Sequence, residues 1–138
     1  MPLISKPPHF GPLVFSLWAL LSGCQVDPTA ALDSVTDPVW VVQTLDGAAF
    51  PAAATLRFSP DGRVSGKAPC NHYFGAVKFT SSDLSIGPLG STRMACEALD
   101  EETHYLLALA AMTQVKTSLG QLILRDASGR ELTFKKQD

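Results

Sequence analysis

The chain has 138 residues, of which 46% are hydrophobic and 17% are charged, and its formal net charge at pH 7 is −2. This length fits one domain with a modest core and leaves little room for a second domain. The weak acidity is spread along the chain and forms no basic patch, so the composition disfavours nucleic-acid binding.

Residues 1–23 have the features of a secretory signal peptide. Lys6 precedes twelve uncharged residues, Phe10 to Leu21, and small residues follow. A run of this length is too short to span a bilayer core, which needs roughly 20 apolar residues. We therefore expect an exported protein whose mature part has no transmembrane segment.

The stretch Leu-Ser-Gly-Cys at residues 21–24 resembles a bacterial lipobox. The resemblance implies cleavage before Cys24 and a lipid anchor on this residue that includes palmitate. An ordinary cleaved signal that ends near a cysteine is the alternative. Residue 25 is Gln rather than Asp, which in Gram-negative lipoproteins is typical of outer-membrane sorting. We expect a protein held stably on the outer membrane, facing the periplasm, by more than one acyl chain.

Residues 24–38 contain scattered small and polar residues and no apolar period. This composition predicts a flexible tether between the membrane and a globular domain at residues 39–138.

Short alternating runs separated by turn residues follow the tether and predict β-strands. They lie at residues 40–45, 55–59, 63–67, 76–80 and 83–89. Between the second and third runs, Pro60 presets φ and Gly62 allows a positive φ, which predicts a tight turn.

One helix is predicted between about residues 97 and 113, because acidic residues crowd its first turn and good helix formers follow. A period near 3.6 predicts one buried stripe, made of Leu99, Leu106, Leu109, Ala110 and Thr113. Residues 121–126 and 131–136 predict a closing hairpin. The order of elements favours a mainly β, α+β domain with a curved antiparallel sheet or small barrel.

Six blocks, in this order and at this spacing, resemble the META-domain (HslJ-like) family, formerly a domain of unknown function. They are WVVQTLDG (40–47), LRFSPDGRVSG (56–66), CNHYFG (70–75), LGSTRMAC (89–96), ETHYLLAL (102–109) and LILRD (122–126). The resemblance implies a curved antiparallel sheet approaching a barrel, with the helix packed on it. It implies no catalytic residues. Where the family usually has Gly, this chain has Pro69, which fixes φ and lacks an N–H, so a different turn before Cys70 is expected.

Four positions stand out as family motif residues: Asn71, Gly75, Thr92 and Met94. For the first two, simple turn chemistry is the expectation, with Asn71 capping its own backbone and Gly75 at positive φ. Thr92, Arg93 and Met94 could line a groove, although base rates favour a buried Met94 and an exposed Arg93.

With Cys24 lipidated, Cys70 and Cys96 are the remaining cysteines. A disulfide between them is the leading interpretation in an oxidising periplasm, and closing the loop would stabilise the fold by roughly 3 kcal/mol. Two buried reduced thiols are one alternative. A zinc site that also uses His72 and His104, and a Cys70 nucleophile with a histidine base, are two more.

Two further groups have simple expected roles. Asp100, Glu101 and Glu102 could pass for an acid/base pair, but consecutive helix positions point in different directions, so a solvated helix start is expected. Trp40 is expected to anchor the core. Neither a catalytic set, a metal site nor a cofactor is predicted.

Three functions remain open. The first is a non-catalytic envelope module that binds an envelope protein or supports envelope integrity under stress, and it predicts an exposed apolar patch of roughly a few hundred Å². The second is a carrier of a small apolar ligand inside the barrel. The third is a thiol enzyme at Cys70.

Overall fold

The computed structural model describes residues 8, 11 and 28–138. The predicted signal peptide, apart from those two residues, and Cys24 lie outside this part of the chain. The described elements are α1 (Pro28–Val35), β1 (Trp40–Leu45), β2 (Ala48–Ala49), β3 (Thr55–Ser59), β4 (Arg63–Lys67), β5 (His72–Thr80), β6 (Asp83–Ile86), β7 (Gly90–Ser91), α2 (Leu99–Ala111), β8 (Met112–Ser118), β9 (Gln121–Asp126) and β10 (Glu131–Lys136). Among the described residues, neither helix is long and apolar enough to cross a membrane.

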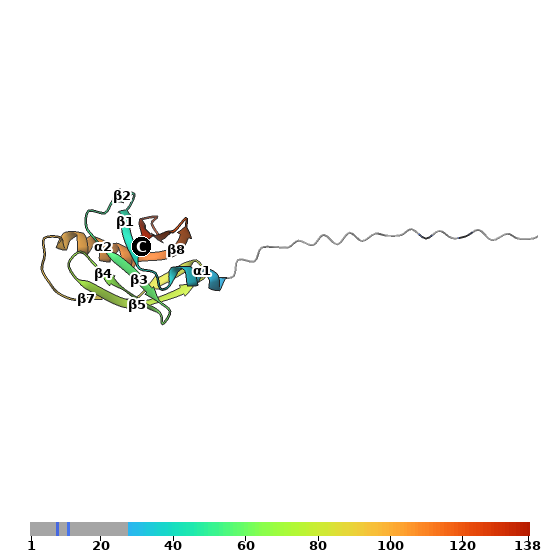
Figure 1. Cartoon of the computed structure of the whole chain (residues 1–138), viewed down its shortest axis with the longest axis horizontal. Coiled ribbons are helices and arrows are strands. Elements are labelled where there is room, and N and C mark those ends of the chain that lie inside the picture. The colour runs from blue at the N-terminus through green and yellow to red at the C-terminus, as the bar shows by residue number, and fades with distance from the viewer. Residues whose placement is uncertain (1–7, 9–10, 12–27) are drawn as a thin grey trace, which may run out of the picture.

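The sheet closes into an antiparallel barrel (Figure 1). Its strands run in the order β10-β9-β8-β6-β5-β4-β3-β1, and β10 also pairs with β1. The closing register places Val42 opposite Phe134. β2 extends the sheet beyond β1, and β7 pairs with β5. The mainly β barrel-like fold predicted from the sequence is therefore confirmed.

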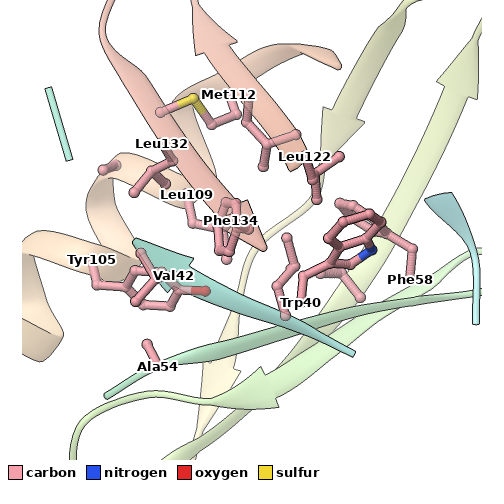
Figure 2. Close-up of a cluster of buried hydrophobic side chains, with 14 of the residues drawn as sticks. Trp40, Val42, Ala54, Phe58, Tyr105, Leu109, Met112, Leu122, Leu132 and Phe134 are labelled. Carbon is pink, nitrogen blue, oxygen red and sulfur yellow. The ribbon is translucent and has the colours of Figure 1, made fainter. Parts of the chain in front are cut away.

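Alternation along the strands explains the core. Leu56 and Phe58 of β3 point inward and are buried, whereas Arg57 between them is exposed. β9 and β10 contribute in the same way, and Figure 2 shows their side chains meeting Trp40 in the interior. The Trp40 ring is buried as predicted, and its Nε1–H donates to the Val35 carbonyl at 3.1 Å. Because these side chains occupy the barrel interior, the described core gives the ligand-carrier hypothesis no support.

Positive φ angles occur where the hairpins need them. Gly62 has φ 80°, which confirms the predicted turn. Asp46 and Gly47 (φ 52° and 80°) join β1 to β2, and Leu119 and Gly120 (φ 50° and 76°) join β8 to β9. Two successive positive φ values match the twist of antiparallel strands, so these two-residue turns set the register of both hairpins.

The helix prediction was right in place but wrong in its buried face. α2 ends at Ala111, and its buried residues are Glu102, Tyr105, Ala108 and Leu109. Of the predicted stripe only Leu109 is fully buried; Leu106 is partly buried, and Leu99, Ala110 and Thr113 are exposed. Apolarity alone does not identify the buried face of α2, because the polar groups of Glu102 and Tyr105 find hydrogen-bond partners in the interior. β8 was not predicted because only two of its seven residues, Met112 and Val115, are apolar, so its alternation is weak.

The expected tether also differs in its second half. α1 occupies Pro28–Val35, and the chain after it packs on the barrel. Val35 is buried, and the Asp37 N–H donates to the Phe58 carbonyl at 2.9 Å. These contacts attach residues 35–37 to β3.

Candidate functional site

The candidate site lies where the β4–β5 hairpin, the segment after β7 and the first turn of α2 meet. The hairpin tip is a two-residue turn of Pro69 and Cys70, closed by the Ala68 N–H donating to the Asn71 carbonyl at 2.7 Å. The N–H groups of Cys70 and Asn71 point to α2 instead of across the turn. Pro69 therefore removes no donor from this arrangement, although it has no N–H of its own.

Glu102 receives these donors. Its Oε2 accepts hydrogen bonds from the backbone N–H groups of Cys70 at 2.7 Å and Asn71 at 2.8 Å, and its Oε1 accepts one from Asn71 Nδ2 at 2.7 Å. The side chain is 4% exposed, which corrects the prediction that it belongs to a solvated helix start. Burial favours the neutral acid, but the hydrogen bonds from Asn71 and Cys70 outweigh it and lower the pKa of Glu102. The tip is thus held by a buried carboxylate.

Asn71 connects Glu102 to the segment after β7. Its Oδ1 accepts hydrogen bonds from the Met94 N–H at 2.5 Å and from Thr92 Oγ1 at 3.0 Å, and its Nδ2 also donates to the Met94 carbonyl at 3.0 Å. Asn71 is 2% exposed and does not cap its own backbone, contrary to the expectation. Its amide acts as a peptide group would in a neighbouring strand, so it extends the ladder of β5 by one pair.

Thr92 completes this ladder. Its N–H donates to the His72 carbonyl at 3.0 Å, and its Oγ1 accepts from the His72 N–H at 3.1 Å. The predicted motif residues Asn71, Thr92 and Met94 therefore lie together. Asn71 holds the backbone of Met94, and Thr92 bonds to the Asn71 side chain.

Gly75 has a different role from the one expected. It lies in β5, and its φ is not in the left-handed region. A Cβ there would lie 2.9 Å from Leu89 Cδ2 and 3.1 Å from the Pro88 carbonyl oxygen. The absence of a side chain lets the chain leading into β7 pass close over β5.

Cys70 and Cys96 form a disulfide with a Cα–Cα distance of 5.8 Å, as the leading interpretation predicted. Neither sulfur is then a free nucleophile or a thiolate ligand. His72 and His104 are both exposed. Within the described residues, no group of three or more His, Cys, Asp or Glu side chains could hold a metal ion. The bridge ties the hairpin tip to the chain just before α2.

A groove of about 550 Å³ opens beside this framework. Residues 89–95 line it together with Leu99, Asn71 and Glu102. Met94 is 63% exposed on its rim, so the expectation of a core position was wrong, whereas the predicted exposure of Arg93 is confirmed. Leu99 is also exposed, and the Phe74 ring, half exposed, lies over Gly90. The groove is therefore a rigid surface with apolar side chains in contact with water.

A second buried polar cluster was missed by the sequence analysis. The hydroxyl of Tyr73 donates to the Thr55 carbonyl at 2.7 Å and lies 2.9 Å from the Tyr105 hydroxyl. Burial is the main reason that the pKa values of both tyrosines are raised. A Cβ on Gly66 would lie 2.0 Å from the Thr55 oxygen, so only glycine fits there. A glycine inside a strand pattern is a signal of such close approach and could have indicated this site.

The comparisons with known proteins agree on the fold. The META domain family model matches residues 33–138. An NMR structure of a protein from Burkholderia xenovorans is 28% identical, has a TM-score of 0.61, and the match covers 99% of each chain. A crystal structure of a DUF4847 family protein from Bacteroides vulgatus ATCC 8482 is 14% identical and has a TM-score of 0.61. The match covers 75% of this chain and 96% of the Bacteroides protein, and it shows likeness of fold alone. Comparison with curated proteins found no match. Because the family model spans most of the chain, the protein belongs to the META domain family.

Proposed function

We propose that this META domain is a non-catalytic partner-binding module of the cell envelope, and that the groove beside Met94 is its binding surface. In this proposal, cleavage of residues 1–23 leaves Cys24 as a lipidated first residue, and the lipid holds the domain on the periplasmic face of the outer membrane. The lipobox-like residues 21–24 and the Gln at position 25 support the anchor. An envelope protein is the partner, and the anchored domain supports envelope integrity under stress.

The exposure of Met94 carries the binding part of the proposal. Its backbone N–H and carbonyl are both held by the buried Asn71 side chain, so the segment is anchored, yet the Met94 side chain stays in water. Leu99 and Phe74 expose further apolar surface close by. Apolar side chains grouped on a rigid surface are typical of sites where a protein partner docks, and methionine adapts readily to a partner's shape.

Crosslinking and pull-down from envelope membranes tests the proposal. The Cys24→Ser form should recover the same partner as the anchored protein, because recognition belongs to the domain. Met94→Asp should lose that partner, since a carboxylate would have to be desolvated on docking. Leu119→Asp is the matched control, because Leu119 is fully exposed at a hairpin turn outside the groove. Recovery at background level with all four forms would contradict the proposed function.

A further inference from the structure

β7 is a free sheet edge. β5 pairs with β4 along one side and, at its N-terminal end, with β7 along the other. In the described part of the chain β7 pairs with no strand except β5. A free edge presents N–H and C=O groups that can pair with another extended chain.

The unpaired groups alternate regularly along this edge. Gly90 pairs with Phe74, Thr92 bonds to His72, and Met94 bonds to Asn71. In an antiparallel ladder, residues between these positions direct their backbone groups to the opposite side. The N–H and C=O groups of Ser91 and Arg93 therefore face away from β5.

The groove follows this edge segment. Residues 89–95 line it together with Leu99 at the start of α2 and the buried side chains of Asn71 and Glu102. Seven extended residues span roughly 20 Å, which is the length of an ordinary strand. The side chains of Met94 and Leu99, which both line this groove, are exposed.

The charges of the groove favour an acidic occupant. Arg93 and Glu102 are its charged lining residues. The Glu102 carboxylate is buried and bonded to Asn71 and Cys70. Arg93, in contrast, is exposed and forms no ion pair with any residue of the described chain. The one charge left for a ligand is positive.

We infer that the outward edge at residues 89–93 binds an extended segment of a partner protein by β-strand addition, with an aspartate or glutamate of that segment beside Arg93. Backbone hydrogen bonds to Ser91 and Arg93 supply the register, and alternate apolar side chains of the segment pack on Met94 and Leu99. This inference rests on the proposed function, because it names the chemistry of the partner at the same groove.

Hydrogen exchange followed by NMR tests the geometry with defined probes. The Cys24→Ser chain is mixed with the acetylated peptide Thr-Val-Thr-Asp-Thr-Val-Thr, or with the same peptide carrying Lys in place of Asp. Strand addition slows exchange at the Ser91 and Arg93 amides by roughly tenfold or more, while the Thr92 and Met94 amides, already bonded internally, change little. Equal slowing at all four amides, or the absence of binding by both peptides, overturns the inference.

Two pairs of variants separate backbone pairing from side-chain contact. Ser91→Pro removes an outward N–H and leaves the bonds to β5, so it weakens peptide binding by roughly tenfold, whereas Ser91→Ala keeps the N–H and binds normally. Arg93→Glu reverses the preference for the Asp peptide over the Lys peptide, and Arg93→Gln abolishes that preference. Ser91→Pro binding at the level of Ser91→Ala contradicts strand addition. If the Ser91→Pro protein fails to fold, the exchange pattern of the unsubstituted edge decides.

The remaining outcomes distinguish this inference from the proposed function. If the Ser91→Pro form recovers the envelope partner while the Met94→Asp form loses it, that result supports the binding module and contradicts strand addition. The chain could instead form a concentration-dependent dimer in which the Ser91 and Arg93 amides are protected without peptide. In that case a second copy of this chain occupies the edge, and the inference is overturned.

Discussion

At the residue scale, Glu102 shows how a charged side chain becomes stable in the interior of this small barrel. Its two oxygens receive two backbone N–H groups and one side-chain amide from the hairpin tip. Bonds to an ionised acceptor are stronger than bonds to a neutral one, so the carboxylate form is favoured despite burial. If Glu102 lost its charge, the N–H groups of Cys70 and Asn71 that it now accepts from would no longer all have an acceptor.

Glu102→Gln should lower the free energy of unfolding by about 2 kcal/mol at pH 7, because one amide NH₂ would face donors instead of accepting from them. The folded-state pKa of Glu102 lies below its unfolded value, so the carboxylate stabilises the fold above the ordinary glutamate pKa. This contribution fades as the pH falls below about 4 and through the folded pKa. Urea unfolding at pH 7 and pH 3 should therefore show the difference between variant and wild type shrinking in acid.

Glu97→Gln serves as the control, since Glu97 is exposed just before the same helix. Its unfolding free energy should match that of the wild type at both pH values. A Glu102→Gln deficit that stays constant between pH 7 and pH 3 would contradict the role assigned to the carboxylate.

Gly66→Ala should destabilise the barrel by about 3 kcal/mol, because the new methyl would overlap the Thr55 carbonyl and the Tyr73 hydroxyl. Gly87→Ala is the matched control, because its nearest neighbour would lie at an ordinary 3.6 Å and its φ is not left-handed. Thermal unfolding of both variants measures the contrast. Equal melting temperatures would show that β3 and β4 can separate without loss.

At the element scale, short connections decide how the strands pair. The β8–β9 turn carries Leu119 at φ 50°, a conformation that leucine adopts only at an energetic cost. The side chain is fully exposed there and gains no packing. The hairpin forms despite Leu119, because the strands on either side of the turn pair from Ser118 opposite Gln121.

Leu119→Asn should raise stability by about 0.5 to 1 kcal/mol, because asparagine followed by Gly120 suits two successive positive φ angles. Leu119→Val should act in the opposite direction, since a β-branched residue is poorly tolerated at positive φ. The midpoints of urea unfolding compare the three proteins. A lower midpoint for Leu119→Asn than for wild type would refute the turn argument.

The disulfide joins two elements, the β4–β5 hairpin and the approach to α2. Reduction should lower the free energy of unfolding by roughly 3 kcal/mol through the larger entropy of the unfolded chain. Unfolding is measured with and without reductant, and the Cys70→Ser, Cys96→Ser double variant is the control that should not respond to reductant. A reductant effect of the same size in that variant would point to a cause other than this bridge.

At the scale of the whole molecule, neighbouring strands of the barrel pair over unequal numbers of residues; we call each such strand–strand boundary a seam. β9 and β10 pair over five residue pairs, whereas β6 and β8 share the single pair Asp83 and Gln114, supported by the Val115 N–H bonded to the Ser82 carbonyl. Local opening follows the places with the fewest interactions. The β6–β8 seam is therefore the expected weak side of the barrel.

Native-state hydrogen exchange tests this seam. The Val115 amide should exchange with a smaller opening free energy than the bonded amides of the β9–β10 ladder, which should approach the global value. Uniform protection across the barrel would contradict a weak seam.

The sequence predicted most of the strands because alternation is a local property. The runs at residues 40–45, 55–59, 63–67, 121–126 and 131–136 correspond to β1, β3, β4, β9 and β10. Gly62 could be predicted for the same reason, since a tight turn depends on the conformations of adjacent residues. The cysteine pair was also the leading interpretation, because an oxidising compartment and two remaining thiols favour a bridge.

The positions of Glu102, Asn71 and Met94 were decided by tertiary structure. Glu102 is buried because the hairpin tip 31 residues earlier brings donors to it, and Met94 is exposed because the Asn71 amide holds its backbone at the edge of β5. Within residues 28–138, β7 pairs with β5 and with no other strand. Local sequence determines where strands and turns form. Closure of the barrel determines which polar groups find hydrogen-bond partners and which apolar side chains remain in water. The physical reason is that the partners of these groups lie far away along the chain.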